Sequence, residues 1–185
     1  MEIGRPDGGA VTPIGPVRLN HAVLFVANLE RSERFYTEVF GMMVVAREPR
    51  ANAAFLRLPN GQNHHDLGLF GVGPQAPPKR RGAIGLYHLA WQVDTIEQLA
   101  AARQTLLDAG AYTGESSHGA TKSLYGADPD GNEFEVMWML PRQEWGAYEN
   151  AAPIDVLDLR AEVERWSGVQ TAGQLVVNTE AADRP

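Results

Sequence analysis

The side chains best suited to chemistry in this sequence are three histidines and a glutamate. They stand at matching places in two successive stretches of the chain: His21 and His65, then His88 and Glu135. Neutral imidazole and carboxylate are good ligands for first-row divalent metals, and the absence of cysteine excludes a thiolate site. If the two stretches pack about a pseudo-twofold axis, we expect all four side chains to converge on one metal.

Each of these side chains also has a plainer interpretation. A single histidine inside a strand is more often a satisfied core residue than a ligand. A carboxylate on an apolar strand face is costly unless it is paired, so Glu135 could instead pair with a buried cation or face water at a strand edge. The occurrence of all four at equivalent positions is what favours a metal site.

Two adjacent histidines, His64 and His65, open the apolar run QNHHDLGLF (62–70). Side chains alternate between the two faces of a strand, so the two rings are expected to point in opposite directions. On that basis His65 shares a face with Leu67 and Leu69, and its imidazole faces an apolar interior.

The elements that must position these side chains recur in the same order in both stretches. Residues 19–41 and 86–110 each read as a short apolar strand, a helix and a terminal glycine. We expect the helices to begin at the N-caps Asn28 and Asp94, with Glu97 completing a capping box in the second. Three strand-like runs follow each helix, and a turn, PNG or DPDG, joins the last two as a hairpin.

This repetition predicts an α+β fold of two tandem βαβββ modules. The expected divisions of the chain are a flexible leader (1–16), module 1 (17–73), a linker (74–83), module 2 (84–140) and a C-terminal extension (141–185). We expect a short helix in the extension over about residues 155–166. Its aromatic side chains could cover the mouth of a site or a partner subunit, or they could pack against the outer face of the sheet: Trp145, Tyr148 and Trp166.

Composition narrows the class of protein. The chain has 185 residues, of which 44% are hydrophobic and 21% charged, as in ordinary globular proteins. A net charge of −7 argues against nucleic-acid binding, and the one basic cluster, Lys79 to Arg81, reads as a solvated linker. No apolar run reaches the length of a membrane span, and the N-terminus lacks the pattern of a signal peptide. Together with the absence of cysteine, this predicts a cytoplasmic protein without nucleic-acid or membrane partners.

Four motifs resemble those of the vicinal oxygen chelate superfamily, which includes glyoxalase I, extradiol dioxygenases and bleomycin-resistance proteins. They are LNHAVLFVANLERSERFY, NHHDLGLF, YHLAWQVD and HGATKSLYGADPDGNEFEV. The second and fourth are particular to ring-cleaving enzymes, so the chain is most similar to the single-domain form of the type I, catechol 2,3-dioxygenase-like enzymes. The resemblance implies a fold in which the two modules form a curved mixed sheet around a metal site.

The resemblance also implies roles for individual residues. It makes His21, His88 and Glu135 the ligands of an Fe(II) ion, with Mn(II), Ni(II) or Zn(II) as alternatives. His65 then corresponds to the acid/base of the family, Tyr125 to its active-site tyrosine and His118 to a further histidine near the substrate. The implied reaction is extradiol cleavage of a catechol with O₂, and a homodimer or higher homo-oligomer is expected.

Two other functions remain open. In a glyoxalase-like or epimerase-like isomerase or lyase, His65 would be a fourth ligand, and Ni(II) or Zn(II) would be favoured over iron. A small-molecule (drug) binding protein ranks lower, since such members typically lack the ligand set. Tyr125 and His118 favour the dioxygenase, because ring cleavage needs such groups near O₂ and a four-ligand isomerase has no evident use for them.

Overall fold

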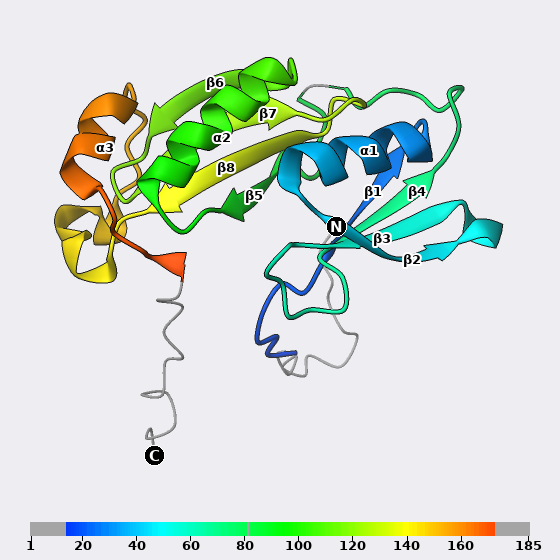
Figure 1. Cartoon of the computed structure of the whole chain (residues 1–185), viewed down its shortest axis with the longest axis horizontal. Helices are drawn as coiled ribbons and strands as arrows, with labels where there is room; N and C mark the ends of the chain where they lie inside the picture. The colour runs from blue at the N-terminus through cyan, green and yellow to red at the C-terminus, as the bar shows by residue number, and fades with distance from the viewer. Residues whose placement is uncertain (1–13, 81, 173–185) are drawn as a thin grey trace, which may run out of the picture.

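The computed structural model describes residues 14–80 and 82–172 (Figure 1). Most of the predicted leader, Arg81 of the basic cluster and the end of the C-terminal extension lie outside the described residues. Within the described part of the chain, no helix has both the length and the apolar character needed to cross a membrane.

Module 1 is a four-stranded mixed sheet with one long helix. Its elements are β1 (Ala22–Val26), α1 (Leu29–Phe40), β2 (Met43–Glu48), a 3-10 turn (Pro49–Ala51), β3 (Ala53–Arg57) and β4 (Leu67–Gly71). The strand order is β1-β4-β3-β2, with β1 parallel to β4 and the other pairs antiparallel. The parallel pair places the starts of β1 and β4 side by side, and His21 and His65 come just before these two starts.

Module 2 repeats this arrangement. Its elements are β5 (His88–Gln92), α2 (Ile96–Asp108), β6 (Tyr112–Ser117), β7 (Thr121–Ala127) and β8 (Glu133–Met139), and its strand order is β5-β8-β7-β6. The predicted α+β fold with two βαβββ modules is therefore confirmed. Among the described residues the eight strands form two four-stranded sheets, not one continuous curved sheet. In Figure 1, α2 lies across the sheet of module 2, and α1 lies next to that sheet.

The helix ends follow local signals, with one correction. The Asn28 side chain accepts a hydrogen bond from the Arg31 amide as predicted, and Gly41 ends α1 with a positive φ of 65°. The N-cap of α2 is Thr95 and not Asp94, because the Thr95 hydroxyl reaches the amide of Gln98 and the Gln98 side chain completes the capping box. The Asp94 carboxylate is engaged elsewhere, accepting from the amides of the C-terminal segment.

Each sheet buries one face under helices, and α1 contributes to both cores. In module 1 the buried residues include Leu24, Leu56, Leu67 and Leu69; in module 2 they include Ile96, Leu99, Phe134 and Trp138. The ring of Phe40, at the end of α1, lies 5.8 Å from that of Trp91 and 5.1 Å from that of Phe134. The two modules are therefore packed together through α1.

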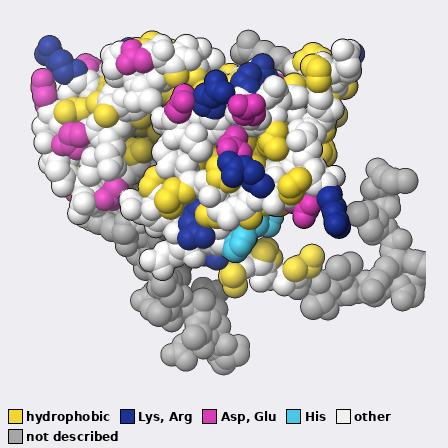
Figure 2. Space-filling view, turned by 45° about the vertical axis from the view of Figure 1, so that its right-hand side comes forward, with side chains coloured by type: hydrophobic (Ala, Val, Ile, Leu, Met, Phe, Trp, Pro, Cys, Tyr) yellow, Lys and Arg dark blue, Asp and Glu magenta, His cyan; other side chains and the backbone are white. Residues whose placement is uncertain are grey.

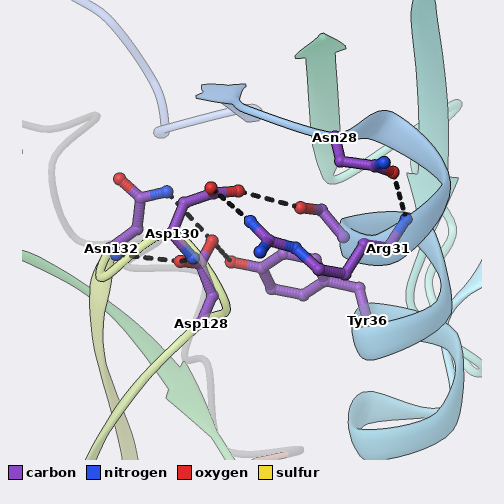
Figure 3. A network of polar contacts seen from close by, with 7 residues as sticks. Asn28, Arg31, Tyr36, Asp128, Asp130 and Asn132 are labelled. Atoms are coloured by element: carbon purple, nitrogen blue, oxygen red, sulfur yellow. Dashed lines mark hydrogen bonds and ion pairs between the residues drawn. The ribbon is translucent and has the colours of Figure 1, made fainter. Parts of the chain in front are cut away.

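A polar network fixes α1 to the turn between β7 and β8 (Figure 3). The buried Tyr36 hydroxyl donates to Asp128, while Arg31 forms an ion pair with Asp130. Asp128 also accepts from two backbone amides of its own turn, so its carboxylate is fully satisfied. Burial, and next the Asp128 charge, raise the pKa of Tyr36 far above its usual value, so Tyr36 remains a donor. This network holds the two modules in one relative position.

The C-terminal extension packs mainly against module 2. The predicted short helix is present as α3 (Leu159–Trp166), preceded by 3-10 turns at Arg142–Glu144 and Gly146–Asn150. Trp145 and Trp166 pack against the core of module 2. Of the arrangements expected for the aromatic side chains of the extension, packing against the sheet is therefore the one found for these two residues. The Lys122 ammonium is buried and lies 2.8 Å from a Glu162 carboxylate oxygen of α3, which anchors the helix to β7.

Candidate metal and substrate site

The predicted site residues lie on the sheet faces that the helices leave open. In β1, Leu24 and Val26 are buried in the core, whereas Val23 and Phe25 are 49% and 72% exposed on the opposite face. His21 directly precedes this strand. Figure 2 shows histidine side chains at the surface, close to hydrophobic and basic side chains. The open face is thus apolar and carries imidazoles.

His65 faces the open side of module 1, not the core. The two adjacent histidines lie in a bend before β4, where strand alternation does not operate. The His65 ring lies 4.6 Å from the His21 ring and 5.0 Å from that of Phe55. Leu67 and Leu69 are completely buried on the helix side, so the prediction that His65 shares their face is wrong.

The rings of His64 and His65 also meet instead of pointing apart, with their Nδ1 atoms 3.0 Å from each other. Partial burial, followed by the neighbouring His21 and His64, lowers the pKa of His65, and Asp66 opposes that effect. The shift favours a neutral imidazole, which is the form that can bind a metal or accept a proton.

Module 2 brings His88 and Glu135 into direct contact. β5 and β8 are parallel neighbours, and His88 Nε2 lies 3.1 Å from Glu135 Oε2. Alternation along β8 buries Phe134 and Val136 on the helix side and directs Glu135 to the open side. The other ring nitrogen of His88, Nδ1, is buried and has no hydrogen-bond partner among the residues that the structure describes.

Tyr125 and His118 form a second contact on the same side of module 2. Tyr125 is paired in register with Glu135, and its ring lies 6.0 Å from the His88 ring. Its hydroxyl oxygen lies 2.7 Å from His118 Nε2. Ser116 joins both groups, with its Oγ 2.9 Å from His118 Nε2 and 3.1 Å from the Tyr125 oxygen. Sequence reasoning missed Ser116, because a serine in a strand carries no signal of its own.

The structure therefore brings the predicted residues together in two groups and not in one. Within residues 14–80 and 82–172, no cluster of three or more His, Cys, Asp or Glu side chains is close enough to hold a metal. His21 lies with His65 in module 1, and His88 lies with Glu135 in module 2. The predicted convergence of all four is not present within one chain.

A cleft of about 930 Å³ runs between the two modules. It is lined by residues of both, among them Val23, Phe25, Lys79 and Leu86. Lys79 comes from the linker and donates to the carbonyl of Tyr87 at 3.0 Å. The linker, expected to be simply solvated, thus contributes one positive charge to the wall of this cleft.

Sequence comparison identifies relatives of this chain. The model of the Glyoxalase/Bleomycin resistance protein/Dioxygenase superfamily matches residues 18–136. Catechol-2,3-dioxygenase of Bacillus subtilis (strain 168) is 30% identical over 128 residues, which cover 69% of this chain and 43% of that protein. Biphenyl-2,3-diol 1,2-dioxygenase 3 of Rhodococcus globerulus is 35% identical over 128 residues, covering 68% and 63%. The matched stretch thus spans 43% and 63% of the length of these two relatives.

Solved structures share the fold at lower identity. A glyoxylase/bleomycin resistance protein/dioxygenase domain from Frankia sp. EAN1pec has a TM-score of 0.59 at 24% identity, covering 68% of this chain and 100% of that one. The genomically encoded fosfomycin resistance protein FosX from Listeria monocytogenes has a TM-score of 0.54 at 17% identity, covering 70% and 98%. At these identities the likeness concerns the fold alone.

Proposed function

The chain belongs to the Glyoxalase/Bleomycin resistance protein/Dioxygenase superfamily, and from that premise we propose that it is an Fe(II)-dependent extradiol dioxygenase that cleaves a catechol with O₂. The observation that carries the proposal is the arrangement on module 2, where a histidine–carboxylate pair stands beside a tyrosine–histidine pair. Relatives named as catechol and biphenyl-diol dioxygenases support the same reaction class.

The donor atoms of His88 and Glu135 fit a divalent metal. Bonds of about 2.1 Å at right angles place two ligand atoms about 3.0 Å apart, close to the 3.1 Å between these atoms. The Glu135 side chain is 12% exposed, and burying an unpaired carboxylate is costly. We propose His21 as the third ligand. Fe(II) bound there would supply the electronic link between a catecholate and dioxygen.

We propose that a second copy of the chain completes this site. The pair His21 and His65 lies on the open face of one module, and the pair His88 and Glu135 on the open face of the other. In a twofold dimer, module 1 of one copy would face module 2 of its partner, and the same contact would occur twice. Each of the two sites would then hold all four side chains.

Two observations support this assembly. The network between α1 and the β7–β8 turn, with Tyr36 on Asp128 and Arg31 on Asp130, opposes a hinge motion that would bring the pairs together within one chain. The open face of module 1 exposes large apolar side chains, Val23 and Phe25, which a protein partner would cover.

The remaining site residues have distinct roles in the proposed reaction. His65, with a lowered pKa, is the acid/base that takes a proton from one catechol hydroxyl and returns it later. Tyr125 forms a hydrogen bond with a substrate oxygen, and His118 stabilises negative charge beside it. The apolar side chains of the open face exclude water from the reacting groups.

A four-ligand isomerase or lyase is the second candidate, and one contact favours it. The His65 ring lies against the His21 ring, with 4.6 Å between the ring centres, so the two imidazoles are close enough to share a metal. In that case His65 binds the metal, Ni(II) or Zn(II) is preferred, and no oxygen is consumed.

The test is anaerobic loading with Fe(II), followed by air and a panel of catechols. A yellow ring-opened product that appears with uptake of one O₂ per catechol supports the proposal. Tight Ni(II) or Zn(II) binding without product from any catechol contradicts it and favours the isomerase. Glu135→Gln, which removes a ligand charge, is the inactive control.

A further inference from the structure

We propose that the C-terminal extension fixes the proton of His118 on Nδ1, and that this makes Tyr125 and His118 a proton-accepting pair for the second hydroxyl of the substrate. The inference rests on the proposed function for its substrate, but the proton position is a property of the folded chain. It assigns a role to Ser116 and to the main chain at Pro153.

The carbonyl oxygen of Pro153 determines the tautomer of His118. His118 Nδ1 lies 2.7 Å from this oxygen. A carbonyl can only accept a hydrogen bond, so Nδ1 must carry the proton. In a neutral imidazole Nε2 then has a free lone pair, which faces the Tyr125 hydroxyl at 2.7 Å. The Tyr125 hydroxyl therefore donates to His118.

Ser116 completes the arrangement as a positioning residue. Its side chain is buried, and its Oγ lies within hydrogen-bond distance of both His118 Nε2 and the Tyr125 oxygen. Since the Nε2 lone pair accepts from Tyr125, the serine hydroxyl donates to the tyrosine oxygen. One lone pair of that oxygen is left to accept a hydrogen bond from a bound hydroxyl.

The segment that carries Pro153 is held against the β6–β7 hairpin. Asp155 and Ser117 form an antiparallel bridge, with two backbone hydrogen bonds of 2.9 Å each. The ring of Tyr148 occupies the space where a side chain at residue 119 would lie, and Gly119 there has a positive φ of 74°. The extension therefore closes over the loop that contains His118.

This geometry permits a balanced transfer of one proton. The substrate hydroxyl gives its proton to the Tyr125 oxygen while the tyrosine proton moves to His118 Nε2. The products are a substrate oxyanion, a neutral tyrosine and an imidazolium. Both N–H groups of that imidazolium then donate a hydrogen bond, Nδ1–H to the carbonyl oxygen of Pro153 and Nε2–H to the hydroxyl oxygen of Tyr125.

The experiment is ¹⁵N NMR of the ring nitrogens in the metal-free full chain, at about pH 8.5, where imidazoles are neutral. His118→Gln identifies the His118 signals by their loss. We expect the Nδ1–H tautomer, with Nδ1 upfield of Nε2. An Nε2–H tautomer in the wild-type chain would overturn the inference.

Two variants at one exposed position test the role of the extension. Asp155→Pro removes one bridge hydrogen bond, and we expect a new Nε2–H population together with a fall in kcat of roughly tenfold or more at similar KM. Asp155→Ala keeps the backbone bridge and should match the wild type. An unchanged tautomer in a folded Asp155→Pro chain counts against the inference. A wild-type chain with the expected tautomer but no catechol cleavage would refute only the proposed function.

Discussion

His88 Nε2 and Glu135 Oε2 lie 3.1 Å apart across two parallel neighbouring strands. The parallel register pairs Ala90 with Glu135, so the imidazole two residues earlier on β5 reaches the carboxylate diagonally. The contact places an imidazole nitrogen and a carboxylate oxygen where one cation could bind both, and it is the geometric basis of the proposed metal site.

Replacing Glu135 by Gln should weaken metal binding by more than about 100-fold, because a charged ligand becomes a neutral amide. Isothermal titration with Mn(II), which is not oxidised in air as Fe(II) is, measures the change. Glu133→Gln, two residues earlier on the same strand, removes the same charge and should leave the affinity within a few-fold. Equal losses in both variants would mean that only the overall charge matters.

Replacing His65 by Phe separates the two candidate functions. If His65 is the acid/base, the metal content stays near that of the wild type while turnover falls by roughly 10²–10⁴-fold. Phenylalanine preserves the aromatic packing against Phe55 and His21. Loss of metal in this variant would instead make His65 a ligand and support the isomerase.

Mixing two inactive variants tests whether the site is shared between copies. His21→Ala and Glu135→Ala each remove one ligand, so neither alone should bind metal. In a mixed dimer one site loses both ligands and the other keeps both. After random exchange of a 1:1 mixture, about one quarter of the wild-type metal capacity should return.

Metal content of the whole exchanged mixture provides the measurement, and wild type mixed with Glu135→Ala is the control. If the wild-type chain binds metal but the mixture recovers none, the site forms within one chain and the dimeric assembly is refuted.

The contact between Tyr36 and Asp128 should stabilise the packing of the two modules. Tyr36→Phe removes a buried hydrogen bond to a charged acceptor, so unfolding free energy should fall by about 1.5–3 kcal/mol. Arg34→Ala, which breaks an exposed ion pair on the same helix, should change it by less than about 0.5 kcal/mol. Urea denaturation followed by fluorescence measures both. Equal effects would contradict the role given to the network.

The same residue predicts a dependence on alkaline pH. Since the pKa of Tyr36 is raised in the folded state, folding keeps its proton where the unfolded chain loses it. The resulting stability is complete below the ordinary tyrosine pKa, about 10, and falls as the pH rises above it. Denaturation at several pH values should show this loss in the wild type and a smaller loss in Tyr36→Phe.

Much of the fold was predictable because its signals are local. Asn28 caps the start of α1 and Gly41 ends the helix, in both cases through contacts within a few residues. The sequence repeat shows that the same order of elements occurs twice. The same duplication predicted that His21, His65, His88 and Glu135 would converge, and of that group His88 and Glu135 are in contact across β5 and β8. The cap of α2 was misplaced by one residue, because the contact between Asp94 and the C-terminal segment depends on chain more than 70 residues away.

The parts of the site that escaped prediction depend on geometry beyond sequence spacing. Alternation failed at His65 because the chain bends before β4, and so the ring turned to the open face instead of the core. Nothing in the sequence indicates that Pro153, through its main-chain oxygen, meets His118. The separation of the two ligand pairs likewise reflects how α1 packs against module 2, which a pattern of residue types does not specify.

The most direct test of the proposed dioxygenase activity is turnover of the best catechol with ¹⁸O₂ by the Fe(II)-loaded chain, followed by mass spectrometry of the product. Extradiol cleavage places both atoms of one O₂ in a ring-opened product, so we expect two labelled oxygens, allowing for exchange of any aldehyde oxygen with water. A product without label, or a catechol oxidised with its ring intact, would refute the dioxygenase proposal.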